Sequence, residues 1–513
     1  MGNDSKEQAT GSPMQEFNSS TKIAAVVIGD YNEKDQLYNP FEHRNKKNAN
    51  SDLGAVAHLL KSSLGTGILA MPNAIKNGGI LFGGIGTIII GMICAHCVHI
   101  LVRSSHVLCK RTKTPQMTYA ETAEAAFLYG PKPVRPFSNV SRIFVNAALC
   151  ATYVGGSCVY VVFISTSIKQ VADYNSGMDI PIRMYILTLI PAVILLGQVR
   201  NLKYLVPFSM IANICMMVGF SITLYYIFIG IQISSNVKLL ASVEQLPTFF
   251  ATVLFAIEGI GVVMPVENSM ANPQRFLGCP GVLNITMTIV VSLYAILGVF
   301  GYLTYGEEVR ASITLNIPIE DLVKMNPRSA DHGESHNLYI VLLYMFCEFV
   351  VSIDPGFVVQ GLIQISLYIK RATFFYRLGQ AVKLLIALAV LFTYGLQYYV
   401  PLEIMWKGLK DKCSHKYQGV CETVLRIVMA LLTVVVALIV PELDPFISLV
   451  GSIFFSILGI SIPAIVETIS CWEGHLGAFK WRLWKNFILV MFSLFALIFG
   501  SWISILDIIK LYR

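Results

Sequence analysis

The chain has 513 residues, of which 55% are hydrophobic and only 13% are charged, and its formal net charge is +7. Soluble globular domains carry about twice this fraction of charged residues, so the composition excludes an ordinary soluble protein. Long charge-free runs indicate a polytopic, all-α membrane protein. A helix of about 20 apolar residues is long enough to cross the hydrocarbon core. Because lipid offers no hydrogen-bond partners, the backbone amides of such a run must bond to one another, as they do in a helix. The clearest runs are 143–168, 204–237, 281–305, 446–466 and 487–506.

The first 52 residues differ from the rest of the chain, because they are polar and mixed in charge. Their apolar run "IAAVV" is too short for the core of a signal peptide. We therefore expect residues 1–52 to form a disordered cytosolic tail and residues 53–513 to form the transmembrane domain.

Eleven membrane-spanning helices are predicted along the chain. Basic residues of membrane proteins are more frequent on the cytosolic side. If the N-terminus is cytosolic, the cytosolic segments contain 24 Lys and Arg, whereas the outer loops and the C-terminal tail contain six; residues 306–383 are not counted. We therefore expect a cytosolic N-terminus. The predicted spans are approximately 53–75, 78–102, 143–168, 181–199, 204–231, 246–267, 281–305, 384–402, 423–441, 446–466 and 487–506.

The first and sixth spans share an unusual pattern. Residues 65–72 read "GTGILAMP" and residues 259–265 read "GIGVVMP", so each has Gly-x-Gly followed by Met-Pro. Glycine weakens a helix and proline cannot donate a backbone hydrogen bond, so each span should unwind near its middle. Interrupted helices at matching positions of two five-helix repeats indicate the substrate site of a transporter, whereas close helix packing is the alternative explanation.

The same two spans carry ionisable side chains in mid-membrane. His58 and Lys61 lie in the first span and Glu258 lies in the sixth. A charged side chain at the bilayer centre costs about 2.5–3.5 kcal/mol, so these groups should face protein or a wet cavity. His58 is a candidate proton site because histidine changes charge between about pH 5 and 8, with Glu258 as the alternative and a packing role as the simpler explanation.

An amino acid zwitterion requires donors for its carboxylate and acceptors for its ammonium group. The helix start after the first break offers free N–H groups and a partial positive charge, and the carbonyl ends near the second break can accept hydrogen bonds. The predicted substrate-binding residues are Ser63, Gly65, Thr66, Gly67, Glu258, Gly259 and Gly261.

Several motifs resemble the proton-coupled amino acid transporters of the amino acid/auxin permease family. They are "HLLKSSLGTGILAMPNAIKNGG" from His58, "FAIEGIGVVMPVEN" from Phe255, "GYLTYGEEVRASITLNIP" from Gly301 and "YGLQYYVPLEI" from Tyr394. The resemblance implies eleven spans, a LeuT-like core of two inverted five-helix repeats, and symport of small neutral amino acids with protons. It also places His58 on the histidine that the family associates with proton coupling.

Residues 320–377 depart from this family, whose members pass from the "SITLNIP"-like motif to the eighth span within a few residues. Residues 338–369 are long enough to cross, but Glu348 and Asp354 lie near their middle. One extra crossing would invert the later spans, so we do not expect one. A retained intron or gene-model error, or a re-entrant insertion, would explain the segment.

Other functions remain as alternatives. A sodium-coupled carrier would use hydroxyl ligands such as Ser62, Ser63 and Thr66, and an amino-acid-sensing receptor would bind substrate with little flux. "CAHCVH" at 94–99 is better explained by packing than by a metal site. We expect no cofactor, no metal, no nucleic-acid partner and no enzymatic activity, since no phosphate loop or nucleophile constellation is found. The membrane should be the plasma membrane or that of lysosomes or endosomes.

Overall fold

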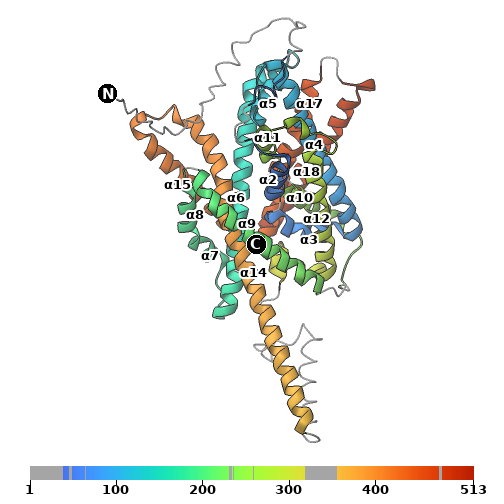
Figure 1. Cartoon of the computed structure of the whole chain (residues 1–513), viewed down its shortest axis with the longest axis vertical. Helices are drawn as coiled ribbons and strands as arrows, with labels where there is room; N and C mark the ends of the chain where they lie inside the picture. Colours follow the sequence, from blue (N-terminus) through green and yellow to red (C-terminus); the bar gives the residue numbers. More distant parts are fainter. Residues whose placement is uncertain are drawn as a thin grey trace, which may run out of the picture.

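The computed structural model describes residues 38–44, 49–63, 65–200, 202–229, 234, 236–257, 259–317, 355–472 and 476–512. Within these residues the fold is a bundle of helices, and the only β-type pairing is an isolated bridge between Asn50 and Met270 (Figure 1). The all-helical prediction is therefore confirmed.

The helices follow the chain in two groups. The first contains α2 (Asp52–Ser63), α3 (Thr66–Gly78), α4 (Ile80–Thr112), α5 (Tyr119–Leu128), α6 (Ser138–Ser176), α7 (Ile182–Thr188), α8 (Ile190–Gly197) and α9 (Leu202–Ile229). The second contains α10 (Leu246–Ile257), α11 (Ile260–Asn268), α12 (Val282–Tyr305), α14 (Pro355–Lys410), α15 (Gln418–Ile439), α16 (Leu443–Val450), α17 (Ile462–Ser470) and α18 (Trp481–Lys510). Two π-helical turns, Gly451–Phe455 and Ile457–Ser461, connect α16 to α17.

Each predicted span coincides with a helix or with neighbouring helices, but the count of eleven is not confirmed. Among the described residues, nine helices are long and apolar enough to cross a membrane, or ten when the bent pair α2 and α3 is counted as one span. The apolar stretch Ile182–Gly197, predicted as a span, is shorter than this and is divided into α7 and α8.

Helix α14 explains part of the unusual region before the eighth predicted span. It runs without interruption for 56 residues, about 84 Å, which is far longer than a membrane crossing requires. The helix therefore joins the second half of the 338–369 segment directly to the predicted span at 384–402, and it projects beyond the bundle in Figure 1. Residues 318–354, including Glu348 and Asp354, lie outside the described residues.

The predicted N-terminal tail ends earlier than expected. Residues 38–44 and 49–51 precede α2, and Arg44, only 8% exposed, contacts the end of α11. Asn50 forms backbone hydrogen bonds with Ser269 (2.8 Å) and Ala271 (2.9 Å). The prediction of a disordered tail is therefore wrong for these residues, because polarity was mistaken for disorder where the polar groups have buried partners. Residues 1–37 and 45–48 lie outside the described residues.

Candidate substrate site at the interrupted helices

The first interruption lies at the predicted glycines. Helix α2 ends at Ser63 and α3 begins at Thr66, with a bend of 55° between the two helices. Gly65 has an extended, non-helical backbone, and its N–H donates to the Ser63 carbonyl (2.8 Å). Pro72 does not contribute to the break, because it lies inside α3 and removes only one hydrogen bond from a helix packed on all sides.

The second interruption separates α10 from α11. Helix α10 ends at Ile257, Gly259 has non-helical backbone angles (φ −138°, ψ 15°), and α11 begins at Ile260. Pro265, like its counterpart in α3, lies within a helix. Glu258 lies outside the described residues, so its predicted roles in substrate binding and proton transfer stay predictions.

A single tyrosine connects the two interruptions. The hydroxyl of Tyr294, on α12, donates toward the Ser63 carbonyl at the end of α2 and the Ala256 carbonyl at the end of α10, the latter at 3.0 Å. Tyr294 is completely buried. The two helix ends, whose carbonyls lack helical partners, therefore converge on one phenol.

Helix α6 supplies two further phenols to this region. Tyr160 forms a hydrogen bond with the Thr66 side chain. The Tyr153 hydroxyl lies so close to Gly261 that a Cβ there would come within 2.5 Å of it. Both glycine-containing breaks are thus covered by tyrosines from helices that are not themselves interrupted.

A small cavity adjoins the breaks and is lined by Ser62, Ser63 and Gly259, together with side chains of α4, α12 and the first π-helical turn. Its volume is about 30 Å³. That volume holds a water molecule rather than an amino acid. The helices around the breaks must therefore move apart before a substrate can enter.

The structure separates the predicted site residues into two groups. The first group lies at the interruptions and consists of Ser63, Gly65, Thr66 and Gly259. Gly261 is the second residue of α11. Gly67 instead packs against the backbone of α10, because a Cβ on it would lie 2.7 Å from the Cα of Ala256. Gly67 is therefore closely packed, as in the alternative explanation, and its predicted role in substrate binding stays a prediction.

The first-span ionisable residues do not reach the cavity. His58 is exposed on α2 and, within the described part of the chain, its side chain makes no hydrogen bond or ion pair. Lys61 is also exposed, and its ammonium group donates to the Ser209 hydroxyl on α9. The proton-coupling role of His58 remains a prediction.

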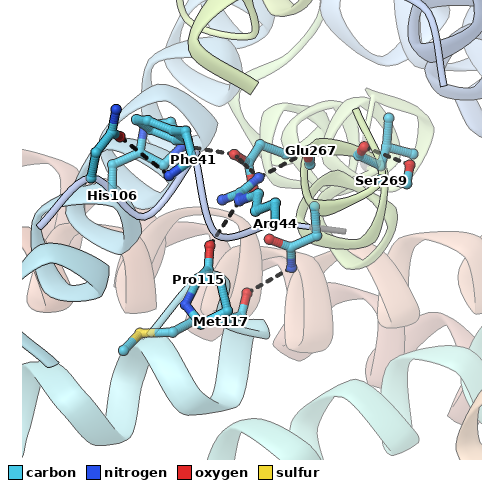
Figure 2. A network of polar contacts seen from close by, with 10 residues as sticks. Phe41, Arg44, His106, Pro115, Met117, Glu267 and Ser269 are labelled. Carbon is cyan, nitrogen blue, oxygen red and sulfur yellow. Dashed lines mark hydrogen bonds and ion pairs between the residues drawn. The ribbon is translucent and has the colours of Figure 1, made fainter. Parts of the chain in front are cut away.

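A buried polar cluster surrounds the end of α11 (Figure 2). Glu267 is fully buried and accepts from Arg44 Nη1 (2.9 Å), and its Oε1 also lies 2.7 Å from His106 Nε2 of α4. Arg44 Nε donates to the Pro115 carbonyl (2.8 Å), and its guanidinium lies 5.3 Å from the Phe41 ring centroid. The segment before α2 is therefore attached to α11 by a buried ion pair.

The opposite end of the site carries a smaller polar contact. The Asn73 amide of α3 donates to Asp444 of α16 (2.6 Å), and Lys76 Nζ donates to the Val309 carbonyl (3.1 Å). These contacts attach α3 to α16 and to the segment that follows α12.

Sequence reasoning missed the residues that hold the breaks together. Tyr294 is one of several uncharged polar residues in its span, and Arg44 lies in a segment predicted to be unstructured. Lys383, another missed residue, is buried on α14 and donates to Gln170 Oε1 (2.8 Å). Glu267 is a charged residue at the end of a predicted span and Lys383 directly precedes another, which was the available signal, but it does not identify their partners.

Comparison with known proteins identifies the family to which these features correspond. Residues 49–326 and 356–506 match the family described as "Transmembrane amino acid transporter protein". The unmatched interval between them lies inside the predicted insertion at 320–377. The chain is 39% identical over 477 residues to the proton-coupled amino acid transporter-like protein pathetic of Drosophila melanogaster, covering 93% of this chain and 89% of the relative.

More distant similarities extend over most of the chain. The probable amino acid transporter skat-1 of Caenorhabditis elegans is 22% identical over 468 residues, covering 89% of this chain and 90% of that protein. Among solved structures, the inward-facing conformation of Mhp1 aligns with a TM-score of 0.48 at 9% identity, covering 91% of this chain and 92% of Mhp1. The Eremococcus coleocola manganese transporter aligns with a TM-score of 0.44 at 10% identity, covering 90% and 92% respectively.

Proposed function

Since this chain belongs to the transmembrane amino acid transporter family, we propose that it carries small neutral amino acids together with protons by alternating access. Amino acid transport is the function of the family. The observation that supports a substrate site in this chain is the meeting of two interrupted helices at Tyr294, beside a cavity lined by Ser62, Ser63 and Gly259.

The two kinds of helix end at the breaks complement the two charges of an amino acid. The N–H groups of Thr66 and Gly67 begin α3, where the helix dipole favours a carboxylate. The carbonyls of Ser63 and Ala256 end α2 and α10, where an ammonium group would be favoured. In the closed site the Tyr294 hydroxyl donates toward these carbonyls. The substrate ammonium group would replace this hydroxyl as their hydrogen-bond donor.

Opening of the site must widen the 30 Å³ cavity. Helices α2 and α11 are the elements to move, because they are less buried than α3 and α10. We place the N-terminus in the cytosol, so that release of Arg44 from Glu267 would accompany opening toward that side.

Proton coupling is supported by the name of the Drosophila relative, which describes a proton-coupled amino acid transporter-like protein. A proton entering a compartment that is negative inside gains about 2.3 kcal/mol per 100 mV, which can drive uptake of a neutral substrate. His58 is the proposed proton carrier, with Glu258 as the alternative. The membrane is either the plasma membrane or a lysosomal or endosomal membrane, since each can present an acidic face.

The proposal is tested with the purified full-length chain in proteoliposomes. Uptake of radiolabelled glycine, alanine, proline and serine is measured with and without an inward proton gradient, in sodium and in choline buffers. We expect uptake to rise with the proton gradient, to be electrogenic and to be indifferent to sodium. Flux that follows sodium alone would favour the sodium-coupled carrier, and substrate binding with negligible flux would favour a sensing receptor.

The role of His58 needs a separate experiment. His58→Ala should retain substrate binding and lose most of the response of uptake to the proton gradient. His415→Ala, at an exposed histidine outside the long helices, is the matched control and should respond normally. A full proton response in His58→Ala would remove this histidine from the mechanism and leave Glu258→Gln as the next variant to measure.

A further inference from the structure

The short connection between α14 and α15 brings two cysteines together. Cys413 lies in this connection and Cys421 is the fourth residue of α15, and their two thiols form a hydrogen bond with each other. Both cysteines are free thiols in this structure. Neither the family match nor the proposed transport mechanism assigns a role to this pair.

Backbone contacts, and not only the side-chain rotamers, hold the pair together. Gln418 and Cys421 are one helical turn apart and share a face of α15. The Gln418 side chain donates through Nε2 to the Cys413 carbonyl (3.5 Å) and to the Lys410 carbonyl (3.3 Å). The Cys413 N–H also donates to the Lys410 carbonyl (3.2 Å). The chain is therefore folded back from the end of α14 onto the first turn of α15.

Dissolved reagents can reach this pair of thiols. Both cysteines are half-buried, and residues 411–417 are otherwise exposed. By contrast, Cys97 on α4 and Cys158 on α6 are buried. In Figure 1 the connection lies at the same end of the bundle as α5, the end that the basic loops predict to be cytosolic. A water-soluble oxidant or reductant in that compartment would therefore have access to the two sulfur atoms.

Adjacent thiols can bind a metal ion or be oxidised. In the described part of the chain, no third His, Cys, Asp or Glu side chain joins this pair in an arrangement that could hold a metal ion. Oxidation requires no third group, because one thiolate attacks a disulfide and the second thiol then resolves the mixed disulfide. Cytosolic disulfides are usually transient and often sense the redox state. The pair thus has the features of a redox-sensitive dithiol.

We propose that Cys413 and Cys421 form a reversible disulfide that fastens the end of α14 to the start of α15, with glutathione disulfide as the oxidant. The Cys421 thiolate attacks one sulfur of glutathione disulfide, which breaks its S–S bond and releases one glutathione. Cys413 then loses its proton and attacks the Cys421 sulfur, which releases the second glutathione. The protein gives up two electrons and two protons, and the glutathione disulfide takes them up as two glutathione thiols.

The order of the two attacks follows from the hydrogen bond between the thiols. This hydrogen bond raises the pKa of the Cys413 thiol, and burial adds to the effect. Cys413 therefore keeps its proton at neutral pH, and the first attack belongs to Cys421. An S–S bond of about 2.05 Å then requires a small movement of the connection. Open space beside Gly419, where a Cβ would have no neighbour within 4 Å, gives room for it.

The test exposes the purified full-length chain in detergent to buffers of increasing oxidised-to-reduced glutathione ratio, then alkylates the remaining thiols. Trypsin cleaves after Lys412, Lys416 and Arg426, so the two cysteines fall in separate peptides, 413–416 and 417–426. We expect mass spectrometry to show the disulfide-linked pair of these peptides in most of the protein as the ratio rises. Dithiothreitol should restore the two separate peptides.

The matched control is Cys279→Ser, which removes an exposed cysteine of another loop and should leave the yield of the linked peptides unchanged. Cys413→Ser should abolish the linked peptides and leave glutathione attached to Cys421. Absence of the linked peptides from the unsubstituted protein at every ratio would overturn the proposal. Glutathione attached to both cysteines, with no link between them, would overturn it equally.

A second measurement tests whether the disulfide fastens the connection. Amide hydrogen exchange of residues 411–417 is compared between the oxidised and the reduced protein. We expect oxidation to slow this exchange about tenfold, because the bond closes a short loop, and to have no such effect in Cys421→Ser. Equal exchange in the two states of the unsubstituted protein would show that the bond fastens nothing.

Discussion

The two halves of the interrupted helices are held in different ways. Twelve of the thirteen residues of α3 are buried, whereas only three of the twelve residues of α2 are. The same contrast holds, less strongly, in the second pair, where α10 is buried along most of its length and α11 along about half. Helices α3 and α10 also pack against each other, and so do α2 and α11.

The contacts themselves explain the difference. Helices α3 and α10 meet backbone to backbone at Gly67 and Ala256, an approach that any side chain at residue 67 would prevent. Helix α11 is held through Glu267 by the segment before α2. Close-packed backbone permits little movement, but an ion pair can be broken and hydrated. We therefore expect α3 and α10 to form a fixed pair, and α2 and α11, which are less buried, to form a movable pair.

The largest predicted effect comes from removing the carboxylate that holds the movable pair. Glu267→Ala leaves Arg44 buried without its partner, so we expect a loss of about 3–5 kcal/mol in stability, measured by thermal unfolding of the purified protein. The double variant Arg44→Met/Glu267→Met should recover much of this loss, because it removes both charges together.

The matched control is the exposed ion pair in the same region. Arg275 Nη1 lies 3.1 Å from Asp52 Oδ2, with the arginine side chain 71% exposed. Arg275→Gln should cost less than about 1 kcal/mol, since water screens the pair. Equal losses in Glu267→Ala and Arg275→Gln would show that the buried cluster does not hold α11.

The next effect tests the fixed pair. Gly67→Ala introduces a Cβ that would lie 2.7 Å from the α10 backbone, so we expect a loss of about 1–3 kcal/mol from overpacking and a corresponding loss of uptake. Gly408→Ala is the control, because nothing lies within 4 Å of a Cβ at that helical position. If Gly67→Ala unfolds at the same temperature as Gly408→Ala, the backbone contact is not required.

The smallest effect concerns the tyrosine that joins the two pairs. Tyr294→Phe removes the donor shared by the Ser63 and Ala256 carbonyls and should cost about 1 kcal/mol of stability. Tyr305→Phe is the control on the same helix, because the Tyr305 hydroxyl forms no hydrogen bond with the described residues. This substitution should leave the stability nearly unchanged. Thermal unfolding of both variants measures the difference, and no difference would argue against the bridge.

The predicted insertion shows how sequence reasoning succeeded and failed at neighbouring positions. The departure from the family pattern within 320–377 was visible, and the family match is interrupted inside it, between residues 326 and 356. The continuous helix through 355–410 was not predicted, because 338–369, with Asp354 near its middle, and the span at 384–402 were expected to be separate segments. Its first residue is Pro355. Proline at the first residue of a helix is instead well tolerated, since that position requires no backbone donor.

Local chemistry determined the parts of this protein that sequence alone could predict. Charge-free runs require helices wherever lipid surrounds the chain, and Gly-x-Gly weakens a helix at its own position, so most of the spans and both interruptions followed from the sequence. The tertiary structure alone decided which partners those interruptions have. Arg44 meets Glu267 across 223 residues and Tyr294 meets Ser63 across 231. Such contacts depend on how whole helices pack, and no local pattern encodes them.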